Sequence, residues 1–143
     1  MISNQNLEKT KQEIKKASGT IIVQAQDDRY NRKILEYGKF NILLSPESGF
    51  RKDKLKTLDS GLNHVLAKIA TKNKIAIGIN LQEIKKLQKK EKAERIARIK
   101  QNIKICKKAK TKIKVLNYNN KKQAQSLLLS LGASTLQVKE AVL

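Results

Sequence analysis

The sequence contains few of the residues that build disulfides, metal centres or aromatic platforms. Its 143 residues include one cysteine, one histidine, one proline and no tryptophan. A single cysteine excludes an internal disulfide framework and a cysteine-rich zinc site, and a single histidine excludes the multi-histidine centres of many metallohydrolases. Aromatic residues make up only 3% of the chain, which argues against an RNA-reading surface of many stacked rings. We therefore expect neither a metal site nor a cofactor.

Long apolar segments are also absent. No run approaches the roughly 18 apolar residues that a membrane span needs, and the first residues, MISNQNLEKTKQ, lack the apolar stretch of a secretory signal. We expect a cytoplasmic protein without a membrane partner. A length of 143 residues favours one domain that covers residues 1–143.

Acidic residues are scarce relative to basic ones. The chain has 12 Asp and Glu against 32 Lys and Arg, which gives a net charge of +20 at pH 7. A net charge of about 2–8 is enough for the solubility of a small domain, and the excess repels itself unless a polyanion neutralises it. Nucleic acid is the favoured partner, because Lys and Arg release counterions when they contact phosphates. An anionic membrane surface is the weaker alternative, and an AT-rich genome that favours Lys, Ile and Asn codons would explain the composition without any partner.

Short apolar runs alternate with segments of helical periodicity. The runs predict strands, and the periodic segments predict helices. The expected strands are 20–25, 41–45, 75–80 and 112–117, and the expected helices are 4–17, 29–37, 60–72, 82–109, 121–131 and 134–142. This alternation is typical of βαβ units around a parallel sheet, and hence of the α/β class. A closed barrel needs eight strands and about 250 residues, so we expect a partial, incomplete TIM-like barrel or an open doubly wound sheet.

Basic charge is densest on the helix predicted over 82–109 and just beyond it. Residues 85–114 hold 14 Lys and Arg and only two acids. The lysines fall outside the apolar stripe, which ends near Cys106, a residue that we assign to the core. One interpretation is a basic ridge along an RNA backbone, and the other is a solvated outer helix face. The residues that we select for RNA binding on this ridge are Lys85, Lys89, Lys92 and Lys100.

Basic residues also follow the first two predicted strands. Arg29 and Arg32 come after the first strand, and Arg51 and Lys52 come after the second. The carboxyl ends of parallel strands meet at one rim, where binding sites of α/β proteins lie. We therefore expect these four side chains on a solvent-facing rim, in contact with phosphate. The adjacent acids Asp27–Asp28 are interpreted as helix caps in preference to a metal-binding pair.

The helix predicted over 60–72 offers a further anion contact. Asp59 or Ser60 is expected to cap it, which would put Asn63 and His64 in its first turn, where free N–H groups attract anions. His64 and Lys68 are four residues apart and share one face. We select Asn63, His64 and Lys68 for RNA binding. The alternative for His64 is a surface or half-buried histidine bonded to a loop carbonyl.

Several segments together resemble a known family. The run from Ser45 to Ile84, and above all GLNHVLAKIA and KIAIGINL within Gly61–Leu81, is similar to the central part of ribonuclease P protein component 3, the barrel-fold subunit of archaea and eukaryotes. VQAQDDRYNRKILEYGKFNILLSP, residues 23–46, fits the preceding strand-helix-strand stretch, and QSLLLSLGASTLQVKEAVL, residues 125–143, resembles the final helix pair. The resemblance covers roughly residues 20–143.

This resemblance implies a non-catalytic subunit of an RNA-based endonuclease that removes the 5′ leader of precursor tRNA. The implied partners are the ribonuclease P RNA, precursor tRNA indirectly, and other protein subunits, above all a small ferredoxin-like one. Arg51, Asn63, His64 and Lys68 lie in the best-matching run, and Arg29 and Arg32 are carried over more weakly. Family members have further strands at the N-terminus, so this chain resembles an N-terminally shortened member.

Two other functions fit the sequence less well. One is a general basic protein that binds RNA or the ribosome, and the other is a small metal-dependent α/β phosphoesterase, which the single histidine and the basic rim disfavour. A four-stranded open sheet also leaves two edges that invite pairing with another chain. We therefore expect either a homodimer across an open edge or dependence on the protein and RNA partners for stability.

Overall fold

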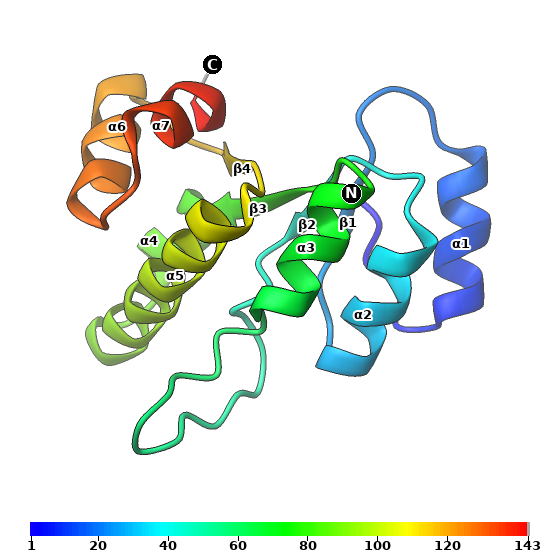
Figure 1. Ribbon diagram of the computed structural model, residues 1–143, viewed down its shortest axis with the longest axis horizontal. Helices are drawn as coiled ribbons and strands as arrows, with labels where there is room; N and C mark the ends of the chain where they lie inside the picture. Colours follow the sequence, from blue (N-terminus) through cyan, green and yellow to red (C-terminus); the bar gives the residue numbers. More distant parts are fainter. Residues whose placement is uncertain (143) are drawn as a thin grey trace.

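The computed structural model describes residues 1–142 and has a parallel sheet at its centre (Figure 1). The sheet contains four strands in the order β1-β2-β3-β4, namely β1 (Ile22–Gln24), β2 (Ile42–Leu44), β3 (Ala76–Asn80) and β4 (Ile113–Leu116). Every neighbouring pair is parallel. Within residues 1–142 the sheet does not close on itself, because β1 and β4 are its ends. The expected α/β class and incomplete barrel are confirmed.

Seven helices in the described part of the chain connect and follow the strands, close to where the periodicity predicts them. They are α1 (Leu7–Lys16), α2 (Asp28–Tyr37), α3 (His64–Lys72), α4 (Leu81–Lys86), α5 (Lys89–Ala109), α6 (Lys121–Ser130) and α7 (Thr135–Ala141). Asp27 caps α2 by accepting a hydrogen bond from the Tyr30 N–H at 2.8 Å, as the helix-cap interpretation requires. No helix within residues 1–142 is long and apolar enough to span a membrane.

The single helix predicted over 82–109 is wrong, because the chain forms two helices there. Leu87 and Gln88 are extended, with ψ of 152° and 159°, and separate α4 from α5. A buried helix face needs an apolar residue about every three or four positions. From Gln88 to Arg95 only Ala93 is apolar, so no continuous stripe links Ile84 to Ile99. The break lets each helix bury its own stripe.

The two faces of the sheet have different roles. One face carries Val23, Leu43 and Ile77, which belong to the main hydrophobic core together with residues of the helices. The opposite face carries Ile42 and Leu44, which register with Ala76 and Gly78 on the next strand. Gly78 is required there, since a Cβ would lie 2.7 Å from Ile42 Cγ2 and 3.0 Å from Leu44 Cδ1.

Both edges of the sheet have neighbours. Ile2 pairs with Val23 as a parallel bridge; its N–H donates to the Ile22 carbonyl and its carbonyl accepts from the Gln24 N–H, both at 2.8 Å. At the other edge α7 packs beside β4, and Lys114 Nζ donates to the Glu140 carbonyl at 2.7 Å. Less backbone is therefore free for edge-to-edge pairing than the sequence predicts, and a homodimer stays a prediction.

The connection between β2 and α3 closes tightly at its base. Gly61 has φ +74°, and a Cβ there would overlap the Pro46 carbonyl and lie 2.8 Å from Arg51 Cζ. Gly19 has nearly the same φ, +72°, but nothing within 4 Å of its Cβ position. The two glycines share the backbone strain that a side chain would bring, and only Gly61 adds a steric clash.

We predict that Gly61→Ala lowers the free energy of unfolding by about 3 kcal/mol or more. Gly19→Ala should cost about 1 kcal/mol, the penalty of a left-handed residue alone. Denaturant unfolding followed by circular dichroism measures both variants. Equal losses would show that the close approach of Gly61 to Pro46 does not constrain the fold.

Candidate nucleic-acid interface

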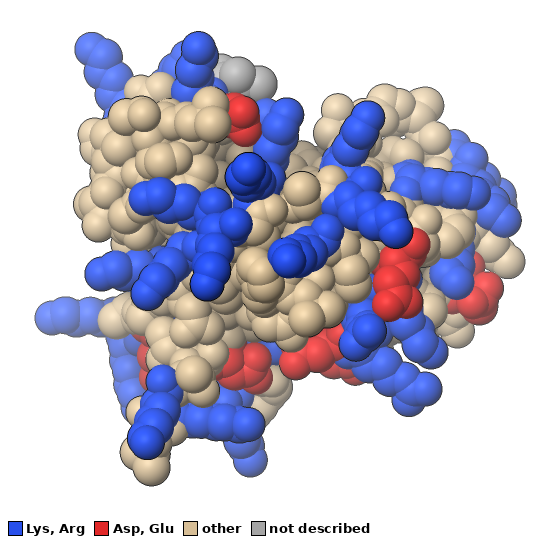
Figure 2. All heavy atoms as spheres, in the orientation of Figure 1, with Lys and Arg blue, Asp and Glu red and all other residues tan. Residues whose placement is uncertain are grey.

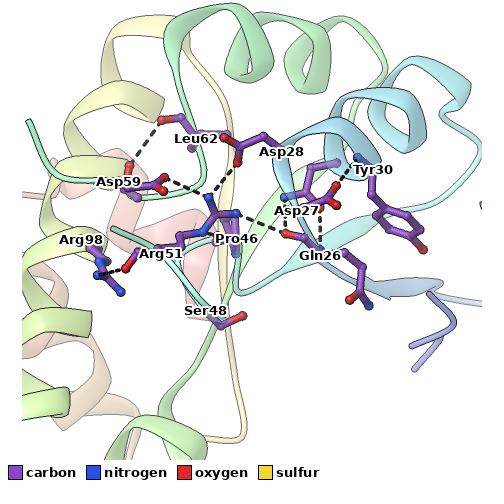
Figure 3. Close-up of polar contacts among 12 residues, drawn as sticks. Gln26, Asp27, Asp28, Tyr30, Pro46, Ser48, Arg51, Asp59, Leu62 and Arg98 are labelled. Carbon is purple, nitrogen blue, oxygen red and sulfur yellow. Dashed lines mark hydrogen bonds and ion pairs between the residues drawn. The ribbon is translucent and has the colours of Figure 1, made fainter. Parts of the chain in front are cut away.

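Arg51 lies inside the base of the connection between β2 and α3 (Figure 3). Its side chain is only 5% exposed. Nη1 donates to Asp28 Oδ1 at 2.7 Å and to Asp59 Oδ1 at 2.9 Å, while Nε and Nη2 donate to the carbonyls of Pro46 and Gln26 at 2.8 and 3.2 Å. One guanidinium thus joins the end of β1, the start of α2 and both sides of the loop.

The expectation that Arg51 faces solvent and contacts phosphate is wrong. The guanidinium group of Arg is planar and has five N–H donors, and three of its nitrogens are already bonded within the chain. The loop folds back over the carboxyl ends of the strands, and this brings two carboxylates and two carbonyls together. They need a buried cation, which Arg51 supplies.

Arg98 of α5 holds the next part of the loop. Its Nε lies 3.2 Å from Asp53 Oδ1, and its Nη2 lies 3.2 Å from Asp53 Oδ2. Nη2 also donates to the Arg51 carbonyl at 3.3 Å. The Asp59 N–H donates to Asp53 Oδ1 at 2.8 Å. The hydrogen bonds from Arg98 and Asp59 lower the pKa of Asp53 below its ordinary value.

Arg95, one turn earlier on α5, pairs with two further acids. It donates to Glu47 Oε1 at 3.2 Å and to Glu83 Oε1 at 3.0 Å. The side chain of Glu47 is 1% exposed, and this burial raises the pKa of Glu47, although the nearby Arg95 charge opposes the rise. We call Arg51, Arg95 and Arg98 the arginine cluster; it binds five of the 12 acids in the chain, namely Asp28, Glu47, Asp53, Asp59 and Glu83.

The first turn of α3 differs from the expected anion site. Asn63, not Asp59 or Ser60, caps the helix, and its side chain accepts from the Leu66 N–H at 2.9 Å. A hollow of about 280 Å³ beside this turn is lined by Lys52 and Lys54 and by the acids Asp28 and Asp59. Carboxylates therefore flank the N–H groups that were expected to attract an anion, because Arg51 recruits them there.

The other residues selected near the rim lie on the surface. His64 and Lys68 are exposed on one face of α3, so His64 is a surface histidine and not a half-buried one. Arg29, Arg32 and Lys52 are exposed as well. Arg32 is engaged with its neighbour on the helix, since its Nε lies 3.1 Å from Glu36 Oε1.

The break between α4 and α5 divides the predicted basic ridge. Lys85 belongs to α4, whereas Lys89, Lys92 and Lys100 belong to α5. Lys85, Lys89 and Lys100 are exposed, and Lys92 is half-buried. Lys85 and Lys92 line the same hollow of about 210 Å³, beside Tyr118 and the start of α6. The structure thus brings these two lysines together across the break.

Two clusters of lysines that were not selected from the sequence also line hollows on the surface. Lys104 and Lys107 join Lys100 along a hollow of about 430 Å³ between α5, Leu58 and Gly132. A larger hollow of about 650 Å³ lies at the amino ends of the strands and is lined by Lys74, Lys110, Lys112 and Lys114. Figure 2 shows Lys and Arg spread over most of the visible face. The second group could have been predicted from the sequence, because residues that precede β3 and β4 lie at the same edge of a parallel sheet.

The acids at the rim and the one thiol lie in ion pairs or in the core. Within residues 1–142, no three His, Cys, Asp or Glu side chains gather as a metal site. The acids at the rim are paired with the arginine cluster, and burial raises the pKa of the Cys106 thiol to about 12. The phosphoesterase alternative therefore has no assembled ligand set in this part of the chain.

Sequence comparison relates the chain to archaeal proteins. No protein-family model matches it. Ribonuclease P protein component 3 of Methanococcus maripaludis is 29% identical over 111 residues, which are 77% of this chain and 45% of that protein. The protein of the same name from Methanocaldococcus jannaschii is 30% identical over 88 residues, 62% of this chain and 35% of that protein.

The chain is similar to archaeal ribonuclease P protein component 3. It spans less than half the length of the curated component 3 proteins that it matches. The fold is similar to one chain in a solved structure of archaeal ribonuclease P with mature tRNA, with a TM-score of 0.80 and 23% identity, and the match covers 97% of this chain and 61% of that one. The resemblance to component 3 predicted from the sequence is confirmed.

We predict that Arg51→Ala destabilises the protein by about 2 kcal/mol, because two carbonyls and two carboxylates lose their donor. Arg32→Ala is the matched control. Its ion pair with Glu36 is at least half exposed on both sides, so its removal should cost about 0.5 kcal/mol or less. Urea unfolding compares the two. Equal, small losses would contradict the role of Arg51 as a structural cation.

A second prediction concerns the pH dependence of Asp53. Because its pKa is lowered in the folded chain, its carboxylate stabilises the fold fully above the ordinary pKa of 3.8 and ceases to do so as the pH falls through the lower folded value. Asp53→Asn should therefore be less stable than the natural chain at neutral pH, and the difference should shrink below 3.8. Unfolding titrations at several pH values measure it; a difference that does not change with acidification would contradict the Arg98–Asp53 assignment.

Proposed function

We propose that this chain is a non-catalytic protein subunit of ribonuclease P that binds the catalytic RNA and supports removal of the 5′ leader of precursor tRNA. Its relatives carry the name ribonuclease P protein component 3. The similar solved chain comes from archaeal ribonuclease P with mature tRNA. The chemistry in this proposal belongs to the RNA, and the chain supplies a binding surface.

The distribution of ion pairs carries the proposal. Four of the five arginines are paired with acids within residues 1–142, but Lys11 is the only one of the 27 lysines that is. Lysine charge is therefore left for solvent or for an external polyanion. Phosphate groups are the matching partner, because neutralising them releases condensed counterions and makes binding favourable over a broad surface. Such contacts position an RNA but do not read its sequence.

The proposed RNA-binding surface combines selected residues that are exposed or half-buried with Lys104 and Lys107, which line one hollow together with Lys100. It contains Arg29, Lys52, His64, Lys68, Lys85, Lys89, Lys92, Lys100, Lys104 and Lys107. Arg51 and Asn63 are left out, since their side chains serve the loop and the helix cap. Arg32 should contribute less to RNA binding, because Glu36 already neutralises its charge.

The proposal extends to partners and location. Precursor tRNA is met indirectly, through the catalytic RNA, and a small ferredoxin-like subunit is the expected protein neighbour. We propose a cytoplasmic ribonucleoprotein, and self-association as a homodimer is the alternative to partner-dependent stability. Sedimentation of the isolated chain at moderate salt separates the two.

Recovery of RNA from cells tests the function most simply. The tagged chain should recover ribonuclease P RNA in clear excess over ribosomal RNA when both are normalised to their cellular amounts. Recovery in proportion to abundance would favour a general RNA-binding protein. A purified chain with metal-dependent phosphatase activity that a chelator abolishes would favour the phosphoesterase alternative.

We predict that the triple variant Lys100→Gln, Lys104→Gln and Lys107→Gln weakens binding to the ribonuclease P RNA and lowers the salt dependence of the affinity. Each lost phosphate contact should reduce the slope of log K against log salt by about 0.7–0.9. Gln has a helix propensity close to that of Lys, so α5 should stay folded.

The control removes the same charge from α1, through Lys9→Gln, Lys15→Gln and Lys16→Gln. These lysines are exposed and lie outside the proposed surface. A smaller loss is expected for the control in filter-binding or fluorescence titrations at several salt concentrations. Identical losses would mean that only net charge matters.

A further inference from the structure

The connection between β2 and α3 carries two large apolar side chains that are fully exposed. Phe50 and Leu55 have relative exposures of 108% and 107%, whereas the other phenylalanine, Phe40, is 4% exposed. Figure 1 shows this connection extending away from the body of the molecule. Water disfavours such exposure, so these side chains point to a partner outside the chain.

The two side chains project from fixed points. Phe50 directly precedes Arg51, whose guanidinium is bonded on three sides. Leu55 lies in a turn closed by the hydrogen bond from the Lys54 N–H to the Thr57 carbonyl, at 2.9 Å. Between them Asp53 is bound by Arg98. The arginine cluster thus holds the apolar side chains outward at defined places.

Lysines alternate with these apolar residues. Lys52, Lys54 and Lys56 are all exposed, and no ion pair engages them within residues 1–142. The one acid among them, Asp53, is neutralised by Arg98 at 3.2 Å. We call Phe50, Lys52, Lys54, Leu55 and Lys56 the loop tip. Its chemistry is one aromatic ring, one aliphatic side chain and three free ammonium groups.

We propose that the loop tip binds an unpaired stretch of RNA, with the Phe50 ring stacked on one base and the lysines on the flanking phosphates. This inference rests on the proposed function and names the form of RNA that one part of the surface recognises. Aromatic rings stack on splayed bases of single strands and loops, whereas bases inside an A-form duplex are already stacked. A single ring accepts any base, so the contact selects unpaired structure and not sequence.

Affinity measurements on Phe50 variants test the stacking. The probes are an unstructured RNA of about 12 nucleotides and the same RNA annealed to its complement. Phe50→Ala should weaken binding to the single strand about 5- to 100-fold and change duplex binding little. Phe50→Tyr should retain the affinity and Phe50→Leu should not, because only Tyr keeps a ring. Leu136→Ala, at a 63% exposed position on α7, is the matched control and should bind normally.

Fluorescence gives an independent readout, since the chain has no tryptophan. Phe50→Trp introduces a single indole whose emission should be quenched by the single-stranded probe and much less by the duplex. Leu136→Trp places the same reporter on α7 and should not respond. The only requirement is that both variants are folded, which circular dichroism checks. Substitutions at exposed positions should not disturb the fold.

The outcomes separate this inference from the proposed function. Normal single-strand affinity of Phe50→Ala, or equal affinity of Phe50→Leu and the natural chain, overturns the stacking and leaves the RNA-binding function standing if the natural chain still binds RNA. A natural chain that binds neither probe overturns the stacking, and one that also fails to recover ribonuclease P RNA from cells overturns the proposed function as well. A blue shift of the position-50 indole emission with phosphatidylserine vesicles, without quenching by RNA, would overturn the inference in favour of a membrane contact.

Discussion

The ion pairs between the arginine cluster and five acids fix the structure at the carboxyl ends of the strands. Arg51 joins β1, α2 and the loop, while Arg95 and Arg98 tie the loop and α4 to α5. Without these cations, Glu47 would be an uncompensated buried carboxylate, which proteins rarely tolerate. The position of the long connection, and with it the place of the loop tip, depends on this network.

Arginine and lysine have different roles in this chain because their side chains differ in hydration and geometry. The arginine guanidinium is weakly hydrated and planar, and it can bond several acceptors at once, so it suits the crowded base of the loop. Lysine is strongly hydrated and its flexible stem keeps the ammonium in water. Within residues 1–142, six of the 12 acids pair with arginine and only Glu8 pairs with a lysine, so nearly all lysine charge has no acidic partner. A chain of this kind is well suited to assemble with a polyanion.

Much of the fold could be predicted from the sequence, because parallel strands between helices leave short apolar runs that turn residues interrupt. The strands near 20–25 and 75–80 are of this type, and the structure contains β1 and β3 there. The break at Leu87 could have been found from the polar stretch before Ile96, but the high helix propensity of that stretch concealed it. The burial of Arg51 could not be found, since it depends on carboxylates 23 and 8 residues away in the sequence that only the folded loop brings together. Arg95 and Arg98 carry a local signal, because they share the helical spacing of Asn102 and Cys106 on the buried side of α5.

Chemical footprinting of both cation types, with and without the ribonuclease P RNA, tests the account most directly. An amine-acetylating reagent reports on lysines, and a dicarbonyl reagent reports on arginines, each read out by mass spectrometry. We expect RNA to protect Lys52, Lys100, Lys104 and Lys107 and to leave Lys9, Lys15 and Lys16 reactive. Arg51, Arg95 and Arg98 should be unreactive whether or not RNA is bound. Uniform protection of all lysines, or arginines that react in the free chain and are protected only by RNA, would contradict this account.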